Sequence, residues 1–248
     1  MKTLFIISGG PGKEHEVSLL SGDYIMEELI HANIPYKKII IEKDKKWICE
    51  DVEMSEDEGV LFLKKSDALV LQVIHGTYGE DGVLVSLLEK HSIAYVGSSS
   101  LSLMLTIDKF KTENLLKKNL IHTPHSLILN DVEELMSTEL NSPYIIKPNT
   151  EGSSISLYKV NSKDELVPIV EKMLVDHRSI LVQEYISGRE FTCGVIEING
   201  VLTALSPTEI ILTQGDMFDY TAKYTINGCK EVTPALVDEE TTVRIQEL

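Results

Sequence analysis

Twice in its first hundred residues, the chain passes from a short apolar segment into a glycine-rich turn and then into a helical pattern. Residues 4–8 are followed by the turn SGGPG, and the almost continuously apolar residues 68–74 are followed by HGTYGEDG. Continuous apolar strands are typical of parallel sheets covered on both faces. The order of strand, turn, helix and strand predicts an α/β fold. We expect residues 1–100 to form an N-terminal domain of this kind.

The other elements expected in this domain have weaker signals. Apolar residues recur at helical spacing over 15–30; they are Val17, Leu20, Tyr24, Ile25 and Leu29. A second helix is expected over 83–90, and strands over 36–41 and 93–96. The charged, acidic stretch 42–66 predicts a surface excursion with short strands.

The rest of the chain has hairpins and antiparallel pairing, and we divide it into subdomains over 101–178 and 179–248. Asn199-Gly200 predicts a two-residue hairpin turn, because both residues tolerate positive φ. Capping-box spacing predicts helix starts near 131 and 163; the pairs are Asn130 with Glu133 and Ser162 with Glu165. The other expectations are strands over 127–129, 144–147, 155–160, 180–185, 191–198 and 201–207, helices over 106–119 and 238–248, and a mobile loop over 213–233.

Composition excludes several classes of partner. The formal net charge is −16, which argues against binding nucleic acid or an anionic membrane. No apolar run approaches the roughly 20 residues that span a bilayer, and the N-terminus lacks the long apolar region of a signal peptide. The 3 cysteines lie far apart without CxxC spacing. We therefore expect neither a disulfide framework nor a zinc site, and a cytoplasmic protein.

Two turns carry candidate ligand contacts. Glu14 lies in GGPGKEHEVS (residues 9–18), between the first strand and helix. At the carboxyl edge of the sheet, where α/β folds place ligands, it could hold a substrate ammonium. Alternatively, this is a tight turn whose acids favour the positive helix N-terminus. His75 is followed by Gly76 and Gly79, which allow close backbone approach, so that a ligand contact and a purely structural histidine are about equally expected.

Two lysines and two serines are candidate phosphate ligands. Lys147 ends an apolar strand, and the loop after it contains Ser153 and Ser154. Backbone N–H groups, hydroxyls and an ammonium together can hold a phosphate. Lys109 opens a helix, where a cation opposes the macrodipole, and this hints that it serves a ligand. The alternative for both lysines is an ordinary solvated surface position.

Two further segments complete the candidate set. Gln183, Glu184 and Glu190 lie on or just after a strand, where they could bind adenine and ribose or could simply be solvated at a sheet edge. Lys223 and Tyr224 lie in the run FDYTAKY (residues 218–224). This composition fits a lid that closes over an anionic substrate and excludes water, or an ordinary surface loop.

Each signal is weak alone, but their order along the chain is specific. GGxxxEHEVS, HGxxGEDG, VGSSSLSxxLxxDK, IIKPxxEGSS, QEYxxGxEF and FDYxAKY follow one another. This series resembles the D-alanine–D-alanine ligase family of ATP-grasp enzymes, from the first strand to Tyr224. The resemblance implies three α/β domains, with ATP held between the second and third. It also implies ligation of two D-alanines through an acyl phosphate, for peptidoglycan precursor synthesis.

The resemblance assigns roles to the candidate residues. Glu14 matches the acid that holds the first D-alanine's ammonium, and His75 the histidine beside its carboxylate. Glu14, Ser153 and Tyr224 match a hydrogen-bonded triad at the substrate site. The nucleotide positions are Lys109, Lys147, Ser154, Gln183, Glu184, Glu190 and Lys223, and Lys223 corresponds to the lid lysine. A homodimer is common in the family.

The resemblance stops before the family's metal site. Its Mg²⁺ ligands come from strands beyond the lid, and no acid after Tyr224 matches them, so we expect none in this chain. We therefore expect an incomplete C-terminal subdomain, a fragment of a longer ligase and little activity from the isolated chain. The alternatives are a non-catalytic nucleotide-binding remnant, or a ligase that uses D-serine or D-lactate as its second substrate.

Overall fold

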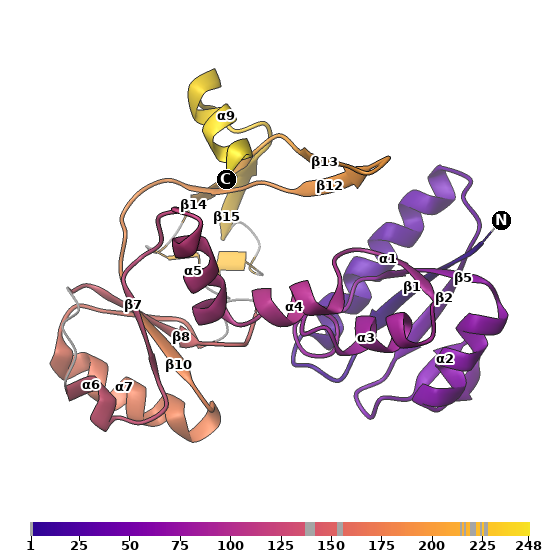
Figure 1. Cartoon of the computed structure of the whole chain (residues 1–248), viewed down its shortest axis with the longest axis horizontal. Coiled ribbons are helices and arrows are strands. Elements are labelled where there is room, and N and C mark those ends of the chain that lie inside the picture. The colour runs from indigo at the N-terminus through magenta and orange to yellow at the C-terminus, as the bar shows by residue number, and fades with distance from the viewer. Residues whose placement is uncertain are drawn as a thin grey trace. The chain divides into compact units, whose positions relative to one another are not determined.

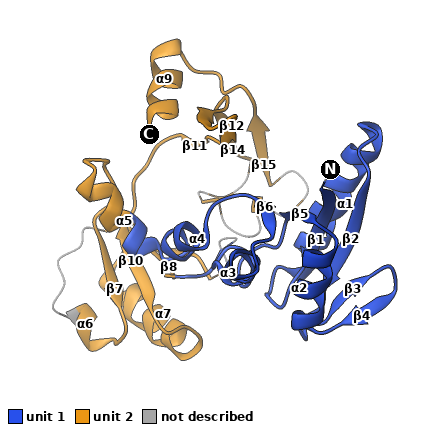
Figure 2. Cartoon of the chain, turned by 45° about the vertical axis from the view of Figure 1, so that its right-hand side comes forward, with its two compact units in different colours: residues 1–112, 150–152 blue, residues 113–149, 153–248 orange. Residues whose placement is uncertain are grey.

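The computed structural model describes residues 2–248 except 137–141, 153–155, 214, 216, 219–221, 224 and 226–227 (Figure 1). The chain forms two compact units (Figure 2). Unit 1 contains residues 1–112 and 150–152, and unit 2 contains residues 113–149 and 153–248. The finer division into domains over 1–100, 101–178 and 179–248 stays a prediction.

Unit 1 is built on a six-stranded sheet with the order β4-β3-β2-β1-β5-β6. Strands β2, β1, β5 and β6 run parallel, as the continuous apolar runs predict, whereas β3 and β4 pair antiparallel at one edge. The strands are β1 (Thr3–Gly9), β2 (Tyr36–Ile41), β3 (Trp47–Cys49), β4 (Val52–Met54), β5 (Ala68–Gln72) and β6 (Ala94–Val96). Phe5, Ile7 and Val70 of the central strands are fully buried in its core.

The helices of unit 1 include two that the sequence analysis does not anticipate. The helices are α1 (His15–His31), α2 (Glu56–Lys65), α3 (Val83–Lys90) and α4 (Ser100–Thr106). Helix α2 occupies the expected surface excursion, and it begins with a capping box between Ser55 and Glu58. The helix expected over 106–119 is confirmed as α5 (Lys109–Lys118), which crosses the boundary between the units, and the unanticipated α4 comes just before it.

Helix α1 packs on the sheet through small and polar residues. Its buried positions are His15, Ser18, Gly22 and Met26. Leu20 is 69% exposed and Tyr24 is 67% exposed, although both belong to the apolar repeat. The reason is close packing, because a Cβ placed at Gly22 would lie 2.8 Å from the Cβ of Ser8 on β1. The helix therefore approaches the strand where its side chains are smallest.

Unit 2 contains a four-stranded antiparallel sheet with the order β7-β10-β8-β9. Its elements are β7 (Ser126–Leu129), α6 (Glu133–Met136), β8 (Tyr144–Pro148), β9 (Tyr158–Val160), α7 (Lys163–Asp176) and β10 (Ile180–Glu184). Alternate strand residues, such as Ile146 and Val182, form a core with Leu166 and Val170 of α7. Because side chains alternate across a strand, Lys147 and Gln183 lie on the opposite face of this sheet.

The remaining elements of unit 2 are short. They are β11 (Glu190–Thr192), β12 (Val195–Ile198), β13 (Val201–Ala204), β14 (Thr208–Leu212), β15 (Cys229–Val232) and α9 (Glu239–Glu247). The strand expected over 191–198 is two strands that join different sheets. Strands β14 and β15 are unanticipated, and β9 begins at Tyr158, later than residue 155. The hairpin prediction is confirmed, since Ile198 pairs with Val201 and both Asn199 and Gly200 have positive φ.

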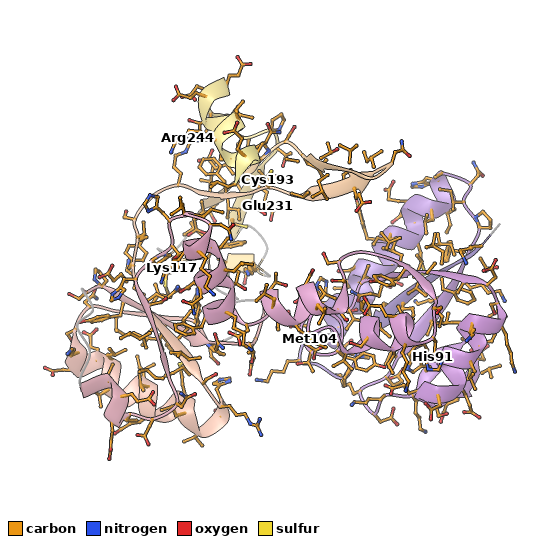
Figure 3. All side chains as sticks on the ribbon, in the orientation of Figure 1. His91, Met104, Lys117, Cys193, Glu231 and Arg244 are labelled. Carbon is orange, nitrogen blue, oxygen red and sulfur yellow. The ribbon has the colours of Figure 1, made fainter. Side chains whose placement is uncertain are left out.

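The cysteines are all free thiols, and Cys49 is buried. The Cys193 thiol, labelled in Figure 3, lies 3.3 Å from the carbonyl oxygen of Leu205 beside the base of the β12–β13 hairpin. Within the described ranges, no helix is both long enough and apolar enough to cross a membrane.

Candidate functional site

The first group of candidate residues lies where the strand order of unit 1 reverses. Chain connections run from β1 outward to β2 on one side, while β5 lies directly on the other side of β1. The turns after β1 and β5 therefore leave the same edge of the sheet side by side. Glu14 lies in the first turn and His75 in the second. Doubly wound sheets bind their ligands at this position.

Two carboxylates approach the backbone of Gly152 in this group. Glu14 is only 7% exposed. A Cβ placed at Gly152 would lie 3.5 Å from both Glu14 oxygens and 3.5 Å from Oε2 of Glu80. Gly76, with a φ of +63°, leaves room for Glu14, because a Cβ there would lie 2.1 Å from Oε2 of Glu14. We call Glu14, His75 and Glu80 the carboxylate cluster. Its two acids can hold an ammonium group.

His75 in the carboxylate cluster has an acceptor near each ring nitrogen. Its Nδ1 lies 3.6 Å from Oε1 of Glu80, and its Nε2 lies 2.9 Å from Oγ of Ser21. The Ser21 hydroxyl also donates to the carbonyl oxygen of Val17, at 3.1 Å. A hydroxyl has one proton, so in this arrangement His75 donates to Ser21.

The carboxyl of Glu80 raises the pKa of His75 above its usual 6.5, and the charge of Glu14 raises it too. Burial of the ring opposes this effect and only partly offsets it. The contact with His75 in turn lowers the pKa of Glu80. Both shifts favour a cationic imidazole beside an ionised acid. A cationic His75 suits the carboxylate end of a zwitterion.

Lys109 lies close to the same cluster. Its ammonium donates to the carbonyl oxygen of Glu151, at 2.6 Å, and its charge contributes to the lowered pKa of Glu80. Lys13 forms an ion pair with the Glu151 carboxylate, at 3.2 Å. These contacts hold residues 150–152 against the rest of unit 1, and they keep Gly152 beside Glu14.

The second group of candidate residues lines a pocket in unit 2, which we call the β8–β10 pocket. Its volume is about 390 Å³, and it is lined by Pro124, Ile145, Lys147, Leu157, Gln183, Glu184, Tyr185, Ile186, Glu190, Met217 and Phe218. Four of the predicted nucleotide residues therefore come together here. Apolar walls with a few polar groups are typical of pockets that bind small molecules.

Lys147 is the cation of the β8–β10 pocket. Burial lowers the pKa of its ammonium, and the charge of Glu113 only partly offsets that effect. Among the described residues, no carboxylate forms an ion pair with Lys147 within 4.0 Å. A half-buried ammonium without an ion-pair partner is costly unless a ligand brings negative charge. The pocket is therefore suited to an anion.

Lys223 lies near the same pocket. Its ammonium lies 5.1 Å from the ring centroid of Phe218, which lines the pocket. Ser153, Ser154 and Tyr224 lie outside the described residues, so their predicted roles stay predictions.

The sequence analysis misses four residues that support these groups: Ser21, Glu80, Glu113 and Phe218. Glu80 stands in the glycine-rich turn already noted, five residues after His75, and could have been found there. Glu113 is buried behind Gln183. The only sequence signal for it is its place one turn after Lys109 on α5.

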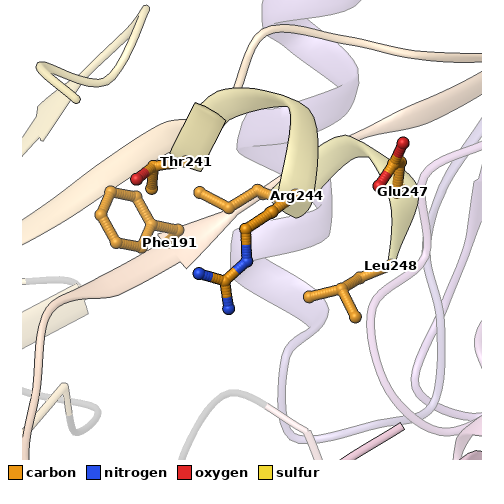
Figure 4. Close-up of a pocket in the computed structure, with 6 residues that line it drawn as sticks. Phe191, Thr241, Arg244, Glu247 and Leu248 are labelled. Carbon is orange, nitrogen blue, oxygen red and sulfur yellow. The ribbon is translucent and has the colours of Figure 1, made fainter. Parts of the chain in front are cut away.

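A separate hollow of about 460 Å³ lies beside helix α9, and it is lined by Phe191, Thr241, Arg244, Ile245, Glu247 and Leu248 (Figure 4). It contains none of the candidate residues. In the part of the chain that the structure describes, no three His, Cys, Asp or Glu side chains lie together in a way that could hold a metal ion.

Comparisons with known proteins connect both groups of residues to one family. The family described as "D-ala D-ala ligase C-terminus" matches residues 114–248. The D-alanine–D-alanine ligase of Petrotoga mobilis is 35% identical over 239 residues, which are 96% of this chain and 74% of that protein. The ligase of the same name from Fervidobacterium nodosum is 32% identical, over 98% of this chain and 77% of that protein.

Solved structures agree with these relatives. The VanG D-Ala:D-Ser ligase from Enterococcus faecalis has a TM-score of 0.80 at 30% identity, over 99% of this chain and 80% of that one. The D-alanine–D-alanine ligase from Bacillus anthracis has a TM-score of 0.74 at 28% identity, over 100% of this chain and 76% of that one. The predicted fold class, an α/β fold of the ATP-grasp type, is confirmed.

Proposed function

The chain belongs to the D-alanine–D-alanine ligase family, and from this we propose that it joins two D-alanines with ATP, through a D-alanyl phosphate. The observation that carries the proposal is Lys147 in the β8–β10 pocket. Its ammonium is half-buried, its pKa is lowered by burial, and it shares the pocket with Gln183 and Glu190. A triphosphate would supply the negative charge that this ammonium needs.

The carboxylate cluster suits the first D-alanine. Glu14 and Glu80 offer two negative charges to the substrate ammonium, and the cationic form of His75 attracts its carboxylate. An amino acid has these two charged groups on one carbon atom. Recognition of both ends would hold the carboxylate in one orientation for attack on the γ-phosphate.

The reaction has two steps. In the first, a carboxylate oxygen of D-alanine attacks the γ-phosphorus of ATP, and ADP leaves, which gives the acyl phosphate. In the second, the amine of another D-alanine attacks the acyl carbon, phosphate leaves, and the amine loses a proton. The chain's residues mainly position the reactants and stabilise phosphoryl charge. In this scheme Lys147 balances charge on the phosphates.

The other roles rest on the resemblance. We propose that Gln183, Glu184 and Glu190 bind adenine and ribose, that Lys109, Ser154 and Lys223 contact phosphates, and that Ser153 and Tyr224 complete a triad with Glu14. Mg²⁺ is expected in this family, but the described residues do not fit a metal site, and no step is assigned to it. A cytoplasmic location and a homodimer stay predictions.

The test is phosphate release by the purified chain with ATP, Mg²⁺ and D-alanine, with D-alanyl-D-alanine detected by mass spectrometry. We expect slow release, in keeping with the little activity expected of the isolated chain, that requires D-alanine and is absent with L-alanine. ATP hydrolysis that does not depend on D-alanine, or D-alanine-dependent release that yields no dipeptide, would contradict ligation.

A second candidate is ligation of D-alanine to D-serine. The 30% identity and the TM-score of 0.80 to the VanG D-Ala:D-Ser ligase favour testing it. Competition between D-alanine and D-serine at equal concentrations, followed by product analysis, distinguishes the two. We expect the D-alanine product to dominate; a dominant D-alanyl-D-serine product would reassign the second substrate. D-lactate in the same assay tests for a hydroxy-acid acceptor.

A further inference from the structure

A buried carboxylate lies directly behind the β8–β10 pocket. Glu113 on helix α5 is only 8% exposed. It accepts hydrogen bonds from the hydroxyl of Ser126 and from the side-chain amide nitrogen of Gln183. Ser126 and Gln183 are direct partners on the antiparallel strands β7 and β10. The carboxylate is therefore held by two adjacent strands, and only Gln183 of these three residues lines the pocket.

This contact determines which way the Gln183 amide faces. A carboxylate accepts hydrogen bonds and cannot donate them, so Gln183 must turn its NH₂ group toward Glu113. The carbonyl oxygen of the amide then remains for a ligand. Without such a partner, an amide can rotate by a half turn at little cost, since its two ends have nearly the same shape.

We propose that Glu113 is a positioning residue that fixes Gln183 as a hydrogen-bond acceptor in the pocket, and so selects a purine with an amino group at its 6-position. This rests on the proposed function, in which the pocket holds the base of ATP. Adenine offers an amino donor to the Gln183 oxygen. Hypoxanthine has a carbonyl oxygen at that position, so two acceptors would face each other.

The sharpest probe is a pair of nucleotides that differ at this position, ATP and inosine triphosphate. Binding of each is measured by calorimetry, and the ratio of the two dissociation constants is the readout. Removing the charge of Glu113 also changes the environment of Lys147. That effect acts on the phosphates of both nucleotides equally and cancels in the ratio.

The key variant is Glu113→Gln, which keeps the shape of the side chain. We expect the wild-type chain to prefer ATP by about tenfold or more, from one hydrogen bond gained and one repulsion avoided. In Glu113→Gln the new amide can accept or donate, Gln183 can turn, and the preference should shrink to about threefold or less. ATP binding itself should persist.

The double variant Glu113→Gln/Gln183→Glu reverses the polarity of the pair. The amide at 113 donates to a carboxylate at 183, and that carboxylate again presents an acceptor to the base. We expect the preference for ATP to return. Gln183→Glu alone places two carboxylates together in a buried site and should bind either nucleotide poorly.

The double variant also serves if Glu113→Gln does not fold, as judged by thermal melting. A preference of the double variant for ATP then supports the proposal, and equal binding of the two nucleotides overturns it.

Ser126→Ala is the matched control, because it removes the other hydrogen bond to Glu113 and leaves Gln183 in place. We expect it to keep the wild-type ratio. A Glu113→Gln protein that is folded and still prefers ATP as strongly as the wild type would overturn the positioning role while leaving the proposed function intact. A wild-type chain that binds neither nucleotide would overturn both.

Discussion

At the scale of single residues, Lys147 stands out for its environment. Its ammonium loses hydration in the β8–β10 pocket, and no described carboxylate forms an ion pair with it. Burial lowers the pKa of its ammonium, so the folded state binds this proton less readily than the unfolded state. The charged lysine therefore works against folding at neutral pH, and this cost begins to fall only as the pH rises through its folded-state pKa toward the unfolded value of 10.5. A buried ammonium that destabilises the fold is best explained by a role in binding an anionic ligand.

Replacing Lys147 by methionine should therefore separate binding from stability. We expect Lys147→Met to weaken ATP binding about tenfold or more, the effect of losing one charge-assisted hydrogen bond, without lowering the melting temperature. Calorimetry and thermal melting measure the two quantities. Lys117→Met is the control, because Lys117 is exposed on α5 (Figure 3). An equal loss of affinity in both variants would contradict a specific role for Lys147.

The pair of His75 and Glu80 predicts a pH dependence. Glu80 raises the pKa of His75 above 6.5, so the stability that this shift provides is present below pH 6.5 and is lost as the pH rises through the folded-state pKa. His75 lowers the pKa of Glu80 below 4.5, so the corresponding stability is present above pH 4.5 and is lost on acidification. The pair should thus stabilise the fold most between these two values.

Glu80→Gln tests this window. We expect its unfolding free energy in urea to fall below that of the wild type mainly between about pH 4.5 and about pH 6.5. The NMR titration of His75 should shift to lower pH in the variant, since the carboxylate is gone. An unchanged His75 titration would show that Glu80 is not the cause of the raised pKa.

At the scale of elements, helix α2 depends on its first turn. The Ser55 side chain accepts from the backbone N–H of Glu58, and the Glu58 carboxylate accepts from the backbone N–H of Ser55, at 2.8 Å. The helix carries acids in its first turn and lysines in its last, which suits its macrodipole. The capping box and the charged helix ends explain why a helix forms in a stretch of low hydrophobicity.

A double-mutant cycle on Ser55→Ala and Glu58→Ala measures this capping box. Loss of the Ser55 cap should cost about 1 kcal/mol in urea unfolding. The double variant should lose less than the sum of the single losses, because the Ser55 hydroxyl also donates to the Glu58 carboxylate, at 2.9 Å, and either single variant already removes that contact. Strict additivity would mean that the two hydrogen bonds act independently.

At the scale of the whole molecule, the two compact units have separate hydrophobic cores. Leu88 belongs to the core of unit 1, and Leu166 belongs to the core of unit 2. Each leucine is almost fully buried. Truncating either one should cost about 2–5 kcal/mol, because a cavity remains where the side chain packed.

We expect each truncation to act mainly on its own unit. In Leu88→Ala, amide hydrogen exchange should accelerate in unit 1 and change little in unit 2, and Leu166→Ala should do the reverse. Mass spectrometry of peptic peptides resolves the two sets. Equal acceleration in both units for either variant would mean that they unfold as one cooperative body.

Elements with strong local signals could be predicted from the sequence. The parallel strands of unit 1, helix α3 and the Asn199-Gly200 turn agree with the structure, because each depends on neighbouring residues. Helix α2 was missed although its capping box is visible in the sequence. Strands β14 and β15 could not be predicted, because each is stabilised by a partner distant in the chain.

The sequence by itself determined which residues could carry chemistry and in what order they occur, since motif spacing and turn residues act over a few positions. Only the tertiary structure decided which of them meet. It buried Gly22 of helix α1 and left Leu20 exposed, brought Glu14 and Glu80 to Gly152, and placed Glu113 behind Gln183. These contacts join residues far apart in the chain, so they depend on strand order and helix packing, which no local pattern encodes.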